Sequence, residues 1–321
     1  CGLTCMFGSV AYQVGNFSGS GMGLSLIFPM LNWKVGGVIL TLLAAYFILG
    51  KNVYHTIERF MRYCVLAMVV CFLISLVASG GFSITGAVSG LIPQIPDPAA
   101  ILTILAFVGS TCSLPGVAYG TYLGKEKKWN RDNLKDGSIN WDTVIGVGSI
   151  GIVVIMVLFV GVEVLKPQGL TVKSVSDLAV ALNPIIGSAA NILIGLAFLG
   201  AAMSSMIANA QMSATLLLSG FGKPYSMESK GVKIVATCVL AFGCVLGLVL
   251  GSAPIQTLMV AAACTIIAMP VLGLFAILLL LRKEMGEYRP SKVYICAMFA
   301  SYALLIAVTI KNISDFIAKY L

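Results

Sequence analysis

Long apolar stretches follow one another along nearly the whole sequence, and they restrict the fold more than any other feature. A helix needs about 20 mostly apolar residues to cross a bilayer, and only brief charged interruptions separate runs of that kind here. Stretches such as 152–162 and 272–281 are apolar on every side, whereas a strand of a membrane barrel alternates apolar and polar residues. Charged residues make up only 10% of the chain, which excludes a soluble domain. The sequence therefore predicts an all-α polytopic membrane protein.

The apolar runs divide the chain into nine predicted spans within a single transmembrane domain, residues 1–321. The predicted spans are 4–30, 35–50, 61–80, 99–123, 143–165, 185–218, 234–251, 254–281 and 293–313. The sequence opens on Cys1 rather than Met, inside the first span and without a charged leader. We therefore expect a fragment whose beginning lies upstream.

Basic residues are distributed unevenly between the two sides of the predicted bundle. Of the 20 Lys and Arg, 15 lie in the connections 51–62, 124–142, 219–233 and 282–292. The positive-inside rule places these connections in the cytoplasm, so the first residue is cytoplasmic and the C-terminus is external. The basic residues behind the net charge of +8 lie in the connections between spans, where membrane topology explains them. The lipid bilayer is therefore the expected partner, and no nucleic acid is implied. On the outer side, residues 174–182 predict a short amphipathic surface helix that ends at Asn183-Pro184.

Ionisable side chains are nearly absent from the predicted spans. All 12 acidic residues lie in connections or near span ends, and His55 lies in a connection. An enzyme inside the membrane needs a base, a nucleophile pair or a metal cluster at that depth. The sequence therefore predicts a protein that is not an enzyme, and nothing in it indicates a cofactor or an obligate protein partner.

The fourth predicted span contains a run of small polar residues followed by Pro115 and Gly116. Proline removes a helical hydrogen bond, and glycine tolerates non-helical dihedral angles. One interpretation is a discontinuous helix, in which the unwound stretch from Thr111 to Gly116 presents backbone carbonyls to a substrate. The other is an ordinary proline kink whose backbone groups are satisfied by neighbouring hydroxyls. Composition alone does not separate the two.

The first span carries two stripes at helical spacing. Gly15, Gly19 and Gly23 recur every four residues and allow another helix to approach closely. The second stripe is polar and comprises Gln13, Asn16 and Ser20, and Asn209 on the sixth span belongs to a similar polar group. These side chains line a permeation path or form hydrogen bonds between helices, and the second role is the more common one.

Four strings, taken in order, resemble the Nramp family of divalent-metal transporters. They are ITGAVSGLIPQIP, GSTCSLPGVAYGTYLGKEKKWN, SVSDLAVALNPIIGSAANILIGLAFLGAAMSS and LLLLRKEMGEY. The second is similar to the broken helix of that family, in which Met-Pro-His follows Gly-Ala. The third is similar to its surface helix and the Ser-Ser span that follows, and the fourth to its Arg-Lys-x-Met-Gly-Glu loop. The match runs through nearly all 321 residues.

The resemblance implies an inverted-repeat (LeuT/APC-like) transporter fold of about eleven helices. The nine visible spans then correspond to the third to eleventh, and the first helix, with its metal-binding Asp-Pro-Gly-Asn signature, lies upstream of Cys1. The substrate or metal site falls on the break, at Thr111, Cys112, Ser113, Leu114 and Gly116.

This chain departs from the family pattern at positions that matter for the metal. The metal-binding methionine of the family falls on Leu114, and its neighbouring histidine falls on Gly116. An acidic pair falls on Gln13 and Asn16, and a glutamine falls near Ala268. Loss of the thioether leaves oxygen ligands, which suit harder ions such as Mg²⁺ or Mn²⁺.

The sequence thus predicts a secondary transporter that moves divalent cations of the Mg/Mn/Fe class by alternating access, without proton coupling, in a bacterial plasma membrane. The metal is substrate rather than cofactor. The alternative is a transporter of the same fold for a small organic solute such as an amino acid, whose carboxylate would meet the half-helix N-terminus near Gly116. A channel or a purely structural membrane protein is a more distant alternative.

Overall fold

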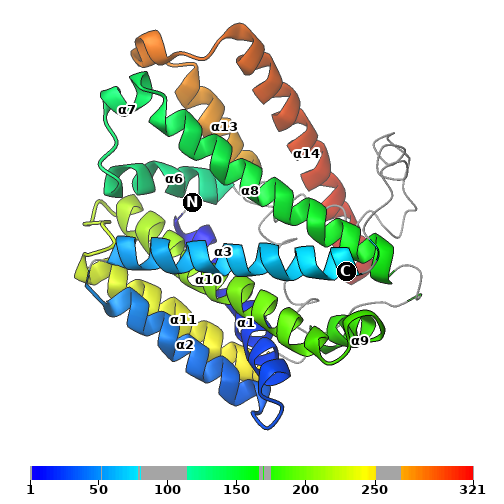
Figure 1. Ribbon diagram of the computed structural model, residues 1–321. Coiled ribbons are helices and arrows are strands. Elements are labelled where there is room, and N and C mark those ends of the chain that lie inside the picture. Colours follow the sequence, from blue (N-terminus) through cyan, green and yellow to red (C-terminus); the bar gives the residue numbers. More distant parts are fainter. Residues whose placement is uncertain are drawn as a thin grey trace.

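In a computed structural model, the chain is an assembly of helices (Figure 1). The structure describes residues 2–51, 53–78, 80, 114–165, 169, 175–250 and 269–320. The α-helices are α1 (Gly2–Ile27), α2 (Trp33–Leu49), α3 (Val53–Ala78), α6 (Leu114–Glu126), α7 (Arg131–Lys135), α8 (Ser138–Val160), α9 (Val175–Ile186), α10 (Ala189–Gly220), α11 (Lys230–Leu250), α13 (Met269–Leu280) and α14 (Lys292–Tyr320). A π-helical turn, Gly161–Leu165, extends α8, and a 3₁₀ segment, Lys283–Tyr288, precedes α14.

Each predicted span contains a helix over all or part of its length. Within the described residues, four helical segments are long and apolar enough to cross a membrane: Val53–Ala78, Ser138–Glu163, Ala189–Gly220 and Lys230–Leu250. The polytopic helical architecture is therefore confirmed, whereas the count of nine spans stays a prediction. One predicted boundary is corrected here. Helix α3 begins at Val53 rather than 61, because Glu and Arg are good helix formers and Glu58 pairs with Arg62 at 2.8 Å one turn later.

Four helices, α1, α2, α10 and α11, pack against one another and form what we call the central helices; α1, α2 and α11 lie below α3 in Figure 1. Helices α1 and α10 are antiparallel, since Gly2 lies against Leu217 and Gly23 lies against Gly195. A Cβ atom added to Gly195 would lie 2.7 Å from the carbonyl oxygen of Gly23. The expected close approach of another helix along the glycine stripe of α1 is thus present.

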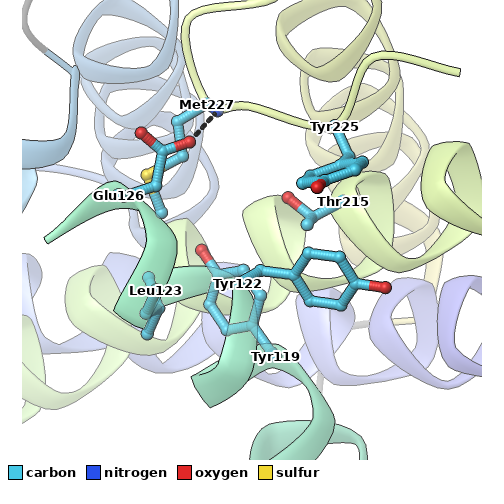
Figure 2. A pocket seen from close by; sticks show the side chains of 7 residues that line it. All are labelled: Tyr119, Tyr122, Leu123, Glu126, Thr215, Tyr225 and Met227. Atoms are coloured by element: carbon cyan, nitrogen blue, oxygen red, sulfur yellow. Dashed lines mark hydrogen bonds between the residues drawn. The ribbon is translucent and has the colours of Figure 1, made fainter. Parts of the chain in front are cut away.

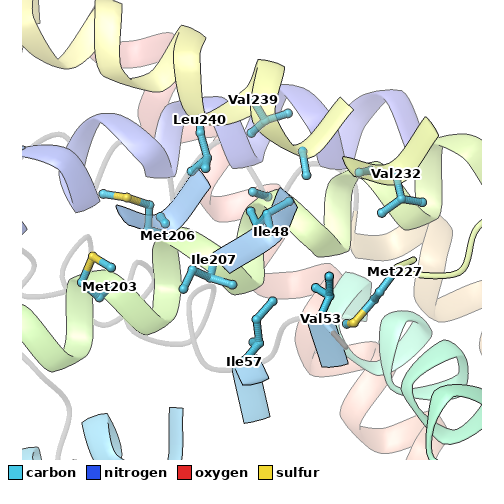
Figure 3. Packing of buried hydrophobic residues seen from close by; sticks show 14 of the residues in the cluster. Ile48, Val53, Ile57, Met203, Met206, Ile207, Met227, Val232, Val239 and Leu240 are labelled. Atoms are coloured by element: carbon cyan, nitrogen blue, oxygen red, sulfur yellow. The ribbon is translucent and has the colours of Figure 1, made fainter. Parts of the chain in front are cut away.

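Two clusters of buried apolar side chains hold the helices together. The first joins α2, α3, α10 and α11 and also takes in Tyr119 of α6 and Met227 of the α10–α11 connection (Figure 3). The second joins α3, α8, α9 and α10. The burial of α9 follows its predicted amphipathic pattern, with Val175, Leu178, Ala179 and Leu182 on the inner side.

The predicted end of α9 at Asn183-Pro184 is corrected. Helix α9 continues through Pro184 to Ile186, because a proline in the last turn removes only one hydrogen bond.

Connections assigned to one side of the membrane lie side by side at the left of Figure 1. The Lys233 ammonium donates to the carbonyl of Gly50 at 2.7 Å, and the Met227 N–H donates to Glu126 at 2.9 Å. These contacts bring together the α2–α3, α10–α11 and α6–α7 connections, as a common side requires. The identity of that side stays a prediction.

Candidate substrate pathway

The described part of helix α6 runs from Leu114 to Glu126. Pro115 and Gly116, which the sequence places in the predicted unwound stretch, are helical in it. Thr111, Cys112 and Ser113 lie outside the described residues, and so does Ala268, so the helix break itself and the metal site stay predictions.

The amide stripe of α1 is buried and contributes to helix packing. The Gln13 side chain is 1% exposed, and its Nε2 donates to the Met206 carbonyl of α10 at 2.7 Å. Asn16 donates to the Gln13 Oε1 at 3.4 Å, and Ser20 donates to the carbonyl of Phe17. Asn209 on α10 is partly buried. Gln13 therefore bridges two helices, and a role of this stripe in lining a path stays a prediction.

Two side chains on α10 are buried without a hydrogen-bond partner. Both amide atoms of Gln211 and the hydroxyl of Thr215 are unpaired within the described structure, although each residue is only 1% exposed. An unsatisfied buried polar group costs about 1–3 kcal/mol. Sequence reasoning missed this pair. The four-residue spacing of two polar residues in an apolar span is the signal that could have found it.

Thr215 lines a small pocket between α6 and the α10–α11 connection (Figure 2). From α6 the pocket receives Tyr119, Tyr122, Leu123 and Glu126, and from the connection it receives Tyr225 and Met227. Three tyrosines, one carboxylate and one unpaired hydroxyl therefore surround it. These groups donate and accept hydrogen bonds, and the pocket lies at the predicted cytoplasmic end of α6.

The end of α6 is bound to the last turn of α10 and to the α10–α11 connection by polar and aromatic contacts. The Tyr122 hydroxyl lies 2.6 Å from that of Ser219, and Lys125 donates to the Tyr225 hydroxyl at 2.9 Å. This hydrogen bond raises the pKa of Lys125. The rings of Tyr122 and Tyr225 meet edge to face with centroids 5.0 Å apart. With the Glu126–Met227 hydrogen bond, these contacts form what we call the α6 latch.

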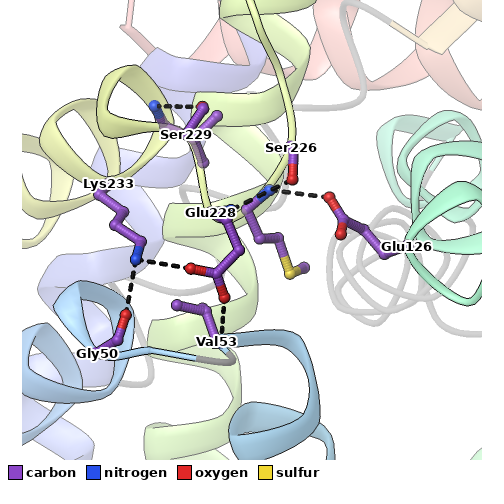
Figure 4. A network of polar contacts seen from close by, with 9 residues as sticks. Gly50, Val53, Glu126, Ser226, Glu228, Ser229 and Lys233 are labelled. Carbon is purple, nitrogen blue, oxygen red and sulfur yellow. Dashed lines mark hydrogen bonds and ion pairs between the residues drawn. The ribbon is translucent and has the colours of Figure 1, made fainter.

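The same connection is bound on its other side to the α2–α3 corner (Figure 4). Glu228 accepts from the N–H of Val53 at 2.6 Å and from the Lys233 ammonium at 2.9 Å. Partial burial opposes ionisation of Glu228, but these two donors outweigh it and hold the pKa of the carboxyl below its ordinary value. Residues 227 and 228 therefore link α6 to the central helices.

Comparison with known proteins identifies the family of this chain. The sequence profile described as "Nramp: Natural resistance-associated macrophage protein-like" matches residues 1–315. The chain belongs to the Nramp family. An "Uncharacterized membrane protein" of Haemophilus influenzae is 24% identical over 220 residues, which are 66% of this chain and 52% of that protein. The match thus spans about half of the relative.

Membership of the Nramp family confirms the resemblance drawn from the sequence, and it agrees with an integral membrane protein. Within the described residues, no group of three or more His, Cys, Asp or Glu side chains could hold a metal ion.

Proposed function

We propose that this chain forms part of a secondary transporter that moves divalent metal cations across the membrane. The observation that carries the proposal is the match of the Nramp profile to residues 1–315. Such a transporter lowers no chemical barrier and needs no cofactor, so the metal is its substrate. The lipid bilayer is its environment, and we place it in a bacterial plasma membrane with the first residue on the cytoplasmic side.

The proposed ions are the harder members of the Mg/Mn/Fe class. In our proposal, backbone carbonyls of the stretch that holds Thr111, Cys112 and Ser113 bind the cation, assisted by the hydroxyl of Thr111 or Ser113. Leu114, at the position of the family's methionine, offers no thioether. Oxygen ligands without sulfur favour Mg²⁺ and Mn²⁺ over softer ions.

The proposed mechanism is alternating access, in which α6 moves relative to α1, α2, α10 and α11. The distribution of contacts supports this division. The four central helices meet through buried glycines and apolar side chains, whereas the end of α6 is held by the hydrogen bonds of the latch. Each such bond contributes about 0.5–1.5 kcal/mol. Inverting a 1:99 equilibrium needs about 5.5 kcal/mol, which a bound substrate can supply.

The second candidate function is transport of a small organic solute such as an amino acid. In this alternative the N-terminal side of α6, near Gly116, meets the substrate carboxylate, because the N-terminus of a helix attracts anions. Both candidates use the same end of α6. They differ in the charge of the substrate that this end receives.

Uptake by liposomes that contain the full-length gene product distinguishes the two. We expect Mn²⁺ to enter and quench a trapped fluorescent chelator, Mg²⁺ to compete with it, and a mixture of radiolabelled amino acids to stay outside. Liposomes without protein give the leak rate. Amino-acid uptake above that rate without metal uptake would replace the first function with the second.

A further inference from the structure

Helix α6 ends in a turn that holds Lys128 in an unusual backbone conformation. The N–H of Lys128 donates to the carbonyl of Lys125 at 3.0 Å, and the N–H of Trp129 donates to the carbonyl of Gly124 at 2.9 Å. A helix end of this kind needs a left-handed residue, and Lys128 has a φ of 57°. It is the one residue other than glycine with a positive φ in the described part of the chain. Glycine adopts this conformation without steric cost, so the backbone does not account for a lysine here.

The positive charge of Lys128 is not used within the described structure. The side chain is exposed, and its ammonium group forms no hydrogen bond or ion pair with any described residue, including the exposed Asp132. Lys125 and Lys127, in contrast, each bind a side chain of another element. Those two lysines already place positive charge at the C-terminal end of α6, where the helix dipole favours it. The charge of Lys128 is therefore available to a partner outside the chain.

An exposed aromatic side chain lies near the same turn. Lys127 pairs with Asp142 at 2.7 Å, and this ion pair joins the end of α6 to the start of α8. Trp141, the residue before Asp142, is thereby brought near Lys128. Its side chain is 67% exposed. Tryptophan combines an apolar ring with one N–H donor and is enriched where a bilayer meets water. A lysine and a tryptophan thus stand exposed beside each other at the junction of two helices.

The turn lies on the side of the protein where a negative surface is predicted. In Figure 1 the turn from α6 to α7 is at the left, as are the α2–α3 and α10–α11 connections. The distribution of basic residues predicts that this side is cytoplasmic, and the cytoplasmic leaflet contains anionic lipids. A phospholipid offers a phosphate to an ammonium group and an apolar boundary to an indole ring. A soluble anion offers only the first.

We propose that Lys128 and Trp141 form a binding site for the headgroup of an anionic phospholipid, which holds the end of α6 at the cytoplasmic surface of the membrane. The Lys128 ammonium binds the phosphate, and the Trp141 ring lies at the level of the glycerol backbone. Glu126 of the α6 latch is two residues before Lys128, so the lipid binds the same end of α6 as the latch. The site does not depend on which solute the protein transports.

Tryptophan quenching by brominated lipids tests the site, because bromine on an acyl chain quenches only nearby indole rings. The full-length gene product, with every tryptophan except Trp141 replaced by phenylalanine, is placed in phosphatidylcholine vesicles. At equal mole fraction, brominated phosphatidylglycerol should quench Trp141 more strongly than brominated phosphatidylcholine. Lys128→Gly should reduce this preference about fivefold, the effect of one basic residue at an anionic membrane surface. Glycine suits the left-handed turn, and thermal unfolding verifies that the variant keeps the fold.

Two further variants separate the lysine of this turn from positive charge in general. Lys128→Arg keeps a cation at the turn and should keep the preference. Lys223→Ala removes another exposed lysine, in the α10–α11 connection, and should also keep it. Equal quenching by the two brominated lipids, or an unchanged preference in Lys128→Gly, would overturn the proposal. Loss of the preference in an excess of inorganic phosphate would also overturn it, because the site would then bind a soluble anion rather than a headgroup.

Discussion

Glu126 in the last turn of α6 accepts a hydrogen bond of 2.9 Å from the backbone N–H of Met227. The two residues are 101 positions apart in the sequence. Glu228, the residue after Met227, accepts a hydrogen bond from the N–H of Val53 at the start of α3. Two adjacent residues of the α10–α11 connection therefore contact α6 and α3. A movement of α6 must break this contact or carry the connection with it.

Substitution Glu126→Ala should therefore favour the state in which α6 has moved away. A hydrogen bond to a charged group is worth about 1.5–3 kcal/mol, less for a partly exposed one, so the open population should rise about tenfold. Nitroxide amino acids incorporated at Thr121 and Lys223, both exposed, would report the α6-to-connection distance by electron spin resonance. Glu126→Gln, which keeps an acceptor oxygen, should restore most of the closed state.

The control for this experiment is Glu58→Ala. Glu58 pairs with Arg62 on α3. Within the described residues it forms no hydrogen bond to α6 or to the α10–α11 connection, so the measured distance should stay unchanged. A distance distribution for Glu126→Ala that equals the wild type would show that the latch does not hold α6.

Glu228 predicts a pH dependence of stability. Its pKa in the folded protein lies below the ordinary value of 4.5, since the Lys233 ammonium and the Val53 N–H outweigh the cost of burial. The stability that the ionised Glu228 carboxylate contributes to the folded protein is therefore fully present above pH 4.5, and it is lost as the pH falls through the pKa of the folded state. The side chain is 48% exposed, so the effect is below about 1 kcal/mol. Tryptophan-monitored melting should show Glu228→Gln less stable than the wild type at neutral pH and equal to it in strong acid.

The glycines between α1 and α10 predict a packing defect. In Gly195→Ala the new Cβ would lie 2.7 Å from both the Gly23 carbonyl oxygen and Ile27 Cγ1, which two packed helices cannot accommodate without separating. Such overpacking costs about 1–3 kcal/mol. Gly146→Ala on α8 is the matched control, because no described atom lies within 4 Å of its added Cβ. Gly146→Ala should leave the free energy of unfolding unchanged or raise it by a few tenths of a kcal/mol, because alanine has the higher helix propensity. Thermal unfolding in detergent measures both.

The sequence was sufficient to predict the features that depend on composition and local spacing. Apolar runs located the helices, and Gly19 and Gly23 marked the face that meets α10, because both signals repeat at intervals shorter than two helical turns. Hydropathy identifies the residues that lie in the membrane and does not identify the ends of a helix. The span predicted from residue 61 therefore starts later than α3, which begins at Val53. The unpaired state of Gln211 and the Glu126–Met227 bond depend on which distant helices meet, and one sequence does not contain that information.

Leu114→Met should change the ion preference if Leu114 borders the cation. A thioether adds a soft ligand, so affinity for Cd²⁺ and Mn²⁺ should rise relative to Mg²⁺, by about tenfold for one added ligand contact. Isothermal titration of wild type and variant with each ion measures the ratio. Val117→Met, also on α6 and exposed, controls for a methionine added elsewhere. An unchanged ratio would show that Leu114 lies away from the site and that the alignment of the break is wrong.

Transport should proceed without protons along the described helices. A proton relay needs groups that titrate near neutral pH, and the positions that carry acids in the family hold Gln13 and Asn16, whose amides do not titrate in this range. Both are buried, and Gln13 is bound to the Met206 carbonyl. The membrane potential supplies about 2.3 kcal/mol per charge per 100 mV, so a divalent ion gains about 4.6 kcal/mol at 100 mV without a proton.

Liposomes with a trapped pH dye measure directly whether protons accompany the metal, and a proton ionophore calibrates the signal. We expect metal uptake with a constant internal pH; acidification that scales with uptake would show that a relay exists and that the amides of α1 do not interrupt it.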